Sequence, residues 1–118
     1  MKTLIIRPRE GKVPSFQVVD FTGHNFNIDF GQLPKVLGVE FLDCKPHGKF
    51  LNVVLDEERN KKKEYTSWYC EPLRTMLNGP VATLSQRDGD PYFPIKGFEN
   101  QEVLHVCRKA GYEEYPSI

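Results

Sequence analysis

Long apolar runs are missing from this sequence. No stretch of consecutive apolar residues exceeds three, whereas a membrane-spanning helix needs roughly 18 or more. The first such run, residues 4–6, is also shorter than the apolar region of about seven residues in a secretion signal. The 3 cysteines are odd in number, which does not fit a framework of paired disulfides. We therefore expect a cytoplasmic protein with reduced thiols and no membrane span.

An excess of charge of one sign is missing too, because 16 Lys and Arg residues balance 16 Asp and Glu residues. Dedicated nucleic-acid-binding proteins are usually strongly basic, so this balance argues against that class. The 9 glycines are scattered singly, unlike those of a phosphate-cradling loop. No serine lies in a Gly-x-Ser-x-Gly motif. The sequence favours a protein without catalysis or cofactor, and a small metal-independent hydrolase or nuclease stays an alternative.

The chain is nevertheless long enough for one folded domain. It has 118 residues, of which 39% are apolar, and a chain of this size buries roughly two thirds of its unfolded surface. No composition shift or internal repeat marks a second domain. Residues 1–118 are therefore expected to form a single globular domain that needs neither disulfides nor metal to fold.

Short runs of β-branched and aromatic residues predict a protein made mostly of strands. The expected strands cover residues 2–7, 15–21, 25–30, 35–43, 49–55, 65–70, 81–87 and 92–95. The link between residues 15–21 and 25–30 has hairpin length, so these two runs are expected to pair antiparallel. The charged residues 56–64 are expected to form the tip of a second hairpin, and Pro72 to begin a short helical turn.

Only the C-terminal part of the chain carries a clear helix signal. Its apolar residues recur at helical spacing: Val103, Val106, Cys107 and Ala110. Asn100 suits the N-cap and Gly111 the position after the helix, which predicts a helix over about residues 101–110. The predicted fold class is therefore α+β and mostly β, with an antiparallel sheet, or a small barrel or sandwich, of about six to eight strands and one C-terminal helix.

Cysteines and histidines are the candidate metal ligands. Cys44 and His47 have the spacing of a zinc-binding pair, and His105 and Cys107 offer two further ligands. Residues two apart on a helix point about 200° apart, however, so His105 and Cys107 cannot face one ion. Cys107 also belongs to the apolar stripe. We therefore predict no bound metal.

Aromatic residues in or near turns are the candidates for partner binding, because Tyr and Trp dominate the contact energies of protein interfaces, although a Trp such as Trp68 is more often part of the core. They lie in or near turns, beside polar or proline residues: Tyr65, Trp68, Tyr69, Tyr92 and Phe93. They predict a protein-binding module of the inhibitor or adaptor type, of the kind that phages and bacteria encode, which acts by surface recognition of another protein. Exposed edge strands are also compatible with a homodimer.

A nucleic-acid-binding β domain is the main alternative. Its phosphate contacts would be Arg7, Arg9, Lys61, Lys62 and Lys63. The N-terminal and the lysine-rich segments would have to meet on one face, beside an aromatic residue on which bases can stack. Three acidic residues, 56–58, precede the lysines closely enough to neutralise them. The zero net charge therefore makes this function the less favoured one.

Overall fold

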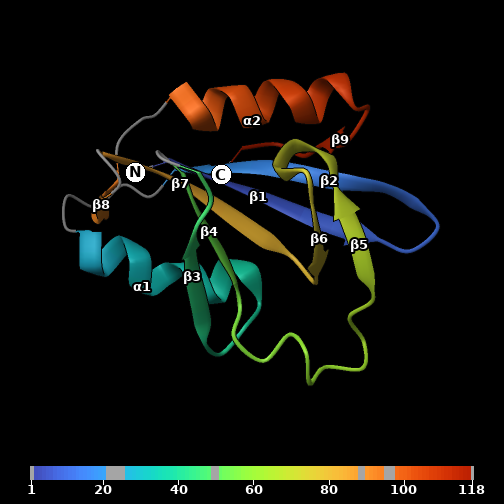
Figure 1. Cartoon of the computed structure of the whole chain (residues 1–118), viewed down its shortest axis with the longest axis horizontal. Coiled ribbons are helices and arrows are strands. Elements are labelled where there is room, and N and C mark those ends of the chain that lie inside the picture. The colour runs from blue at the N-terminus through green and yellow to red at the C-terminus, as the bar shows by residue number, and fades with distance from the viewer. Residues whose placement is uncertain (1, 21–25, 49–50, 88–89, 95–97, 118) are drawn as a thin grey trace.

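Nine strands, two α-helices and one 3₁₀-helix form the described part of the computed structural model, which covers residues 2–20, 26–48, 51–87, 90–94 and 98–117 (Figure 1). In chain order these elements are β1 (Lys2–Arg9), β2 (Lys12–Asp20), α1 (Phe26–Leu37), β3 (Leu42–Pro46), β4 (Leu51–Asp56), β5 (Ser67–Cys70), η1 (Glu71–Leu73), β6 (Thr75–Asn78), β7 (Val81–Arg87), β8 (Asp90–Pro94), α2 (Phe98–Lys109) and β9 (Glu113–Glu114). The predicted class, α+β and mostly β, is confirmed.

The main sheet has the strand order β3-β4-β7-β1-β2-β9, and β8 pairs with β7 outside this path. All of these pairs are antiparallel except β2 with β9, which is parallel, so the sheet is mixed. Strands β3 and β9 end the order without pairing with each other. The described strands therefore form an open sheet, and the barrel alternative is wrong.

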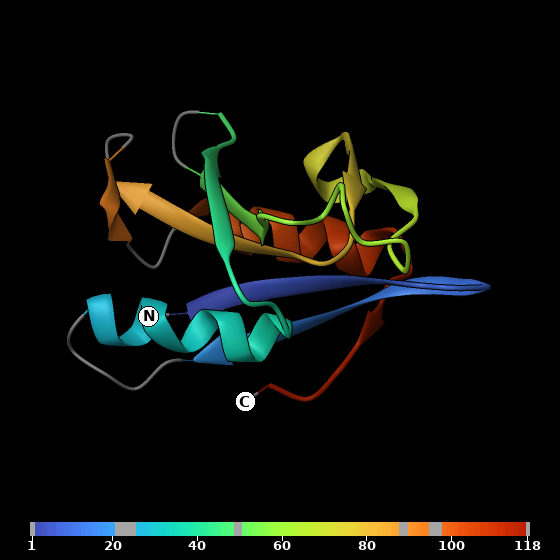
Figure 2. The same ribbon diagram turned by 90° about the horizontal axis from the view of Figure 1, so that it is seen from below.

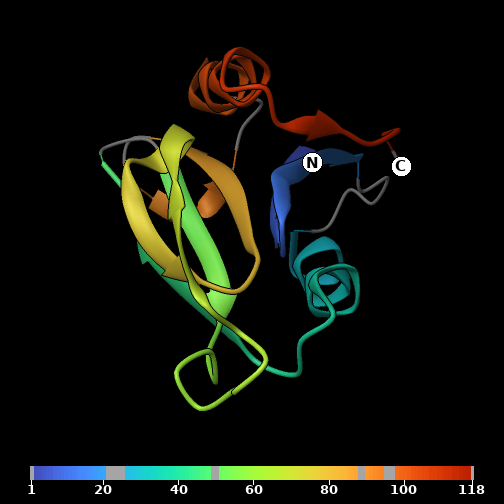
Figure 3. The same cartoon turned by 90° about the vertical axis from the view of Figure 1, so that its right-hand side faces the viewer.

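Side chains on the two faces of the main sheet form two separate clusters of the core. Because successive side chains of a strand point to opposite faces, Leu4 and Ile6 of β1 belong to one cluster and Ile5 to the other. Helix α2 and the segment that holds β5 and β6 cover the first face, and α1 covers the second. Figures 2 and 3 show α1 and α2 on opposite sides of β1. The fold is therefore layered, with a sheet in the middle.

Helix α1 occupies residues 26–30 of the predicted strand 25–30 and residues 35–37 of the predicted strand 35–43, of which only residues 42–43 belong to a strand, β3. Both predictions are therefore wrong over most of their length, and the fold has a second helix. The alternation over 25–30 also fits a helix, because the apolar residues continue at spacings of four, three and four: Phe26, Phe30, Leu33 and Leu37. Leu33 and Leu37 are buried against the sheet. Gly38, with φ +74°, ends the helix, and the N–H of Val39 donates a hydrogen bond to the carbonyl oxygen of Pro34.

The predicted hairpin between residues 15–21 and 25–30 is therefore wrong as well. Strand β2 pairs with β1 instead, with Ile5 opposite Gln17, through a turn in which Gly11 has φ +70°. Residues 21–25 lie outside the described residues. Strand β2 therefore lies between β1 and β9 in the main sheet and is antiparallel to β1 along most of its length.

The second predicted hairpin, with the charged residues 56–64 at its tip, does not form either. Strand β5 pairs with β6 in a separate two-stranded sheet rather than with β4. The predicted helical turn is the single turn η1, which begins at Glu71, contains Pro72 in its first turn and joins these two strands. The small sheet packs through Trp68 and Leu77 against the core beneath it.

The predicted C-terminal helix is confirmed as α2, which begins at Phe98, before the expected N-cap residue Asn100. Val103 and Cys107 are buried, whereas Val106 and Ala110 of the same stripe are only half-buried. Gly111, with φ +78°, ends the helix as expected. The chain then turns into β9, which no sequence pattern predicted.

Candidate partner-binding surface

Tyr65 and Trp68, two of the predicted contact residues, make hydrogen bonds within the chain. The Tyr65 hydroxyl donates to Oδ2 of Asp56 at 3.0 Å, and Nε1 of Trp68 donates to the carbonyl oxygen of Gly79 at 2.8 Å. Both aromatic side chains are half-buried. They therefore connect the small sheet and the loop before it to the rest of the fold.

Tyr69 and Met76 are the large side chains that the small sheet exposes. They lie directly opposite each other on β5 and β6, and 55% of Tyr69 and 58% of Met76 is accessible to solvent. The neighbouring pair, Trp68 opposite Leu77, points to the other face and packs on the core. We call the exposed residues the Tyr69–Met76 pair.

Tyr92 and Phe93 lie in β8, whose side chains are outside the described part of the structure. Among the described strands β8 pairs only with β7, and its register is irregular. Such a position suits Pro91 and Pro94 of this strand, because proline has no backbone N–H to donate to a sheet. Whether these two rings contact a partner stays a prediction.

A groove of about 400 Å³ lies between β3 and β6, next to the Tyr69–Met76 pair, and we call it the β3–β6 groove. The side chains of Val53 and Leu55 from β4 also line it. The remaining lining residues come from β3, the loops and the small sheet: Lys45, Pro46, His47, Arg59, Asn60, Ser67, Thr75, Met76, Leu77 and Asn78. Met76 thus belongs to both the exposed pair and the groove.

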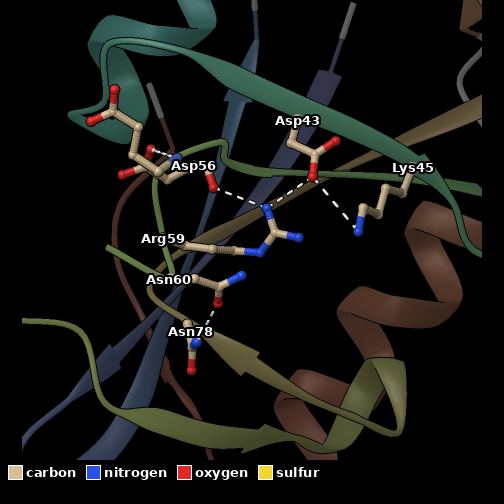
Figure 4. A network of polar contacts seen from close by, with 7 residues as sticks. Asp43, Lys45, Asp56, Arg59, Asn60 and Asn78 are labelled. Atoms are coloured by element: carbon tan, nitrogen blue, oxygen red, sulfur yellow. Dashed lines mark hydrogen bonds and ion pairs between the residues drawn. The ribbon is translucent and has the colours of Figure 1, made fainter. Parts of the chain in front are cut away.

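Arg59 fixes the loop after β4 at one end of this groove. Its Nη1 donates to Oδ2 of Asp43 at 2.8 Å and to the carbonyl oxygen of Asp56 at 3.0 Å (Figure 4). Lys45 Nζ lies 3.7 Å from the same oxygen of Asp43. Two cations therefore share one carboxylate, and one positive charge is left over.

Asn60 ties the same loop to β6. The side-chain amide of Asn78 donates to Oδ1 of Asn60 at 2.9 Å (Figure 4). Oδ1 of Asn78 accepts a hydrogen bond from the Ser67 hydroxyl at 2.7 Å. The loop thus bridges the two sheets. This bridge holds the wall of the groove formed by β6 in a fixed position.

Asp56, at the end of β4, is buried and receives three donors. They are Lys62 Nζ at 2.6 Å, the backbone N–H of Glu58 at 2.9 Å and the Tyr65 hydroxyl at 3.0 Å. Burial by itself raises the pKa of the Asp56 carboxyl, but these hydrogen bonds outweigh it and hold the pKa below the usual range. Asp56 is therefore a structural anion that orders the charged loop.

The cations of the predicted nucleic-acid site are mostly occupied by contacts within the chain. Arg7 donates to the carbonyl oxygen of Val36, Arg9 pairs with Glu113 at 2.6 Å, and Lys62 pairs with Asp56. Arg7 and Arg9 do line one cavity of about 380 Å³ with Tyr65 and Trp68, but Glu10 and Glu64 line it too. Lys61 and Lys63 are exposed and line neither this cavity nor the β3–β6 groove.

A cavity of about 740 Å³, which we call the α2–η1 cavity, lies between α2 and η1 and is lined in part by Leu51 and Val103. His47 lines both this cavity and the β3–β6 groove, so the two adjoin. Arg74 at its rim has φ 52° and ψ 44°, a left-handed conformation that is uncommon for a residue with a side chain. The cavity extends the groove along the same side of the molecule.

The cysteines and histidines do not gather in the described structure. No group of three or more potential ligands comes together there in an arrangement that could hold a metal ion. His105 is exposed and Cys107 is buried, on different sides of α2 as the helical geometry predicts. Burial raises the pKa of the Cys70 thiol to about 12 and that of Cys107 to about 12. Both thiols are therefore protonated core residues at neutral pH.

Within the described residues, no helix is both long and apolar enough to span a membrane.

The sequence indicated Tyr69 but not Met76, Arg59 or the groove. These residues come together with Tyr69 only when the two sheets are assembled.

No family model, curated protein or solved structure that we compared with the chain matches it.

Proposed function

We propose that this protein is a protein-binding module that recognises a partner protein by its surface, without catalysis, as inhibitors and adaptors do. The observation that supports this function best is the Tyr69–Met76 pair, an aromatic and a sulfur-containing side chain exposed side by side. Tyr and Met are both enriched at protein interfaces relative to the rest of the surface. A groove directly beside the pair extends the surface that a partner can cover.

The surroundings of the pair are ordered before a partner arrives. Trp68 and Leu77 anchor the inner face of the small sheet, and the hydrogen bond from Trp68 to Gly79 fixes it against the start of β7. A preformed surface loses less conformational entropy on binding than a flexible one. The small sheet is therefore suited to presenting its outer face to a partner.

Binding of selected peptides tests this function without knowledge of the natural partner. Peptides of random sequence, displayed on phage, are selected on the immobilised full chain, and their sites are mapped by backbone amide chemical shifts. We expect the shifts to centre on β5 and β6. A Tyr69→Ala, Met76→Ala double variant should keep its melting temperature and lose about 30-fold or more in affinity, because one interface hot spot contributes about 2 kcal/mol.

Phe41→Ala provides the matched control, because Phe41 is equally exposed, at 55%, but does not line the groove. This variant should bind the selected peptides like the wild-type protein. The proposal is wrong if no peptide is enriched, or if the selected peptides bind both variants equally well.

A further inference from the structure

We propose that the β3–β6 groove takes an extended, acidic segment of the partner, which adds to the open edge of β6 as a third strand and places a carboxylate against Arg59. This inference rests on the proposed function and names the class of segment that the surface recognises. It comes from two features of the groove, the strand edges that form its walls and the charge of the residues that line it.

The first feature is a pair of unpaired strand edges. Among the described strands, β6 pairs only with β5, and β3 pairs only with β4. All four residues of β6 line the groove, and because successive side chains point to opposite faces, β6 must turn its edge toward the groove. The backbone groups on such an edge can bind an extended peptide by strand addition.

The second feature is an uncompensated positive charge. Lys45 and Arg59 line the groove, whereas no Asp or Glu is among its described lining residues. Asp43, just outside, is shared by Lys45 and Arg59, so it can neutralise only one of them. A neutral or basic segment would leave this charge unpaired on binding, which favours an acidic one.

Arg59 has the geometry to receive the carboxylate. Only 15% of its side chain is exposed, and within the described structure Nη1 is the guanidinium nitrogen that makes hydrogen bonds (Figure 4). Among the described residues no acceptor is bound to Nε or Nη2, and a guanidinium binds a carboxylate best through two such parallel hydrogen bonds. Asp43 and the carbonyl oxygen of Asp56 hold the group in place, so a partner finds it already oriented.

The dimensions of the groove set the length of the segment. The four residues of β6 extend over roughly 13 Å, at about 3.3 Å per residue. A volume of about 400 Å³ lies within the usual range of roughly 300–1,000 Å³ for binding pockets. A segment of about four residues fits, with an apolar side chain over Val53 and Leu55 next to the acidic residue.

The experiment uses the peptides selected on the full chain, each synthesised in two forms. In one form every Asp or Glu is retained, and in the other each is replaced by Asn or Gln, with both ends of the peptide blocked. We expect the exchange to weaken binding about tenfold or more, which corresponds to about 1.4 kcal/mol. Methylation of alternate backbone nitrogens should weaken binding as well, because it removes the donors that pair with β6.

Variants of the protein test the same contact from the other side. Arg59→Gln should lose the preference for the acidic form, and Lys45→Gln, at an exposed position that is not needed to hold the loop, should reduce it. Lys61→Gln changes the net charge equally but lies outside the groove, and it should keep the preference. The Lys45 variant keeps the test decisive if Arg59→Gln fails to fold.

The possible failures are distinguishable. If selected peptides depend on the Tyr69–Met76 pair but bind equally well in both charge forms, the acidic segment is wrong and the protein-binding function stands. If no peptide binds this surface, both are wrong. If a single-stranded oligonucleotide competes for the groove and its binding depends on Arg59, the groove belongs to nucleic acid and the inference is overturned.

Discussion

The aromatic ring of Tyr65 lies against the backbone of Gly79, so closely that a Cβ atom at position 79 would be 2.8 Å from Cε2 of the ring. Gly79 also has φ +78°, a left-handed conformation that side chains disfavour. Its carbonyl oxygen accepts the hydrogen bond from Trp68. Gly79 is therefore the position at which two aromatic side chains attach the small sheet and its loop to β7.

Gly79→Ala should destabilise the fold by more than its backbone conformation alone requires. Gly11 has a similar φ, +70°, but no atom within 4 Å of a Cβ, so Gly11→Ala should cost about 1–2 kcal/mol. The contact with Tyr65 should add roughly 1–3 kcal/mol at position 79. Denaturant unfolding of both variants measures the difference, and in a Tyr65→Ala background this difference should disappear. Equal costs of the two alanines in the wild-type background would contradict the packing.

Asp56 should make stability depend on pH at the acid end. Its folded-state pKa is lowered, since the donors around it outweigh burial, while the unfolded value is about 3.9. The stabilisation is therefore fully present above roughly pH 5 and is lost as pH falls through 4 and through the lower folded-state pKa. Asp56→Asn should reduce the free energy of unfolding at neutral pH by about 1–3 kcal/mol and flatten its decline with falling pH.

Glu57→Gln is the matched control for this pH dependence, because it removes the neighbouring carboxylate at an exposed position. This variant should leave the decline of the free energy of unfolding at acidic pH unchanged. The measurement is the free energy of unfolding in denaturant at a series of pH values. If both variants flatten the curve equally, Asp56 is not the group responsible.

Three adjacent inner strands of the main sheet, β4, β7 and β1, are predictable because their sequences favour a strand locally. Residues 2–7, 49–55 and 81–87 combine β-branched residues in short runs, and they form most of β1, β4 and β7. Helix α2 is predictable for the corresponding reason, since its apolar spacing, its basic last turn and Gly111 all agree. In these segments local preference and tertiary burial favour the same structure.

Residues 25–30 could not be assigned from their alternation, because six residues are too few to distinguish a strand from the first turns of a helix. What decides the structure is the burial of Leu33 and Leu37 against the second face of the sheet. The binding surface is harder still to predict. Tyr69 lies opposite Met76 because of the register in which β5 and β6 pair on either side of η1. Arg59 binds Asp43, which is 16 residues away in the sequence. Such contacts depend on how the two sheets assemble.

The two valines on α2 should respond differently to the same substitution. Val103 is buried, whereas Val106 is half-buried at the α2–η1 cavity, where a carboxylate can reach water. Val103→Asp should destabilise the fold by roughly 3 kcal/mol or more, because it buries a charge without a partner, and Val106→Asp by about 1 kcal/mol. Melting temperatures of the two variants give the comparison. The reverse order would show that α2 packs on the sheet with a different face.

The three thiols should differ in reactivity in the native protein. Cys44 is exposed, whereas Cys70 and Cys107 are fully buried and each has a pKa raised to about 12. Because the thiolate is the reactive form, a thiol reagent at about pH 8 should modify Cys44 first and reach Cys70 and Cys107 only after denaturation. A Cys44→Ser variant should then show no rapid reaction. Rapid modification of a second thiol in the folded protein would mean that α2 does not seal the core against β1 and η1 as the structure shows.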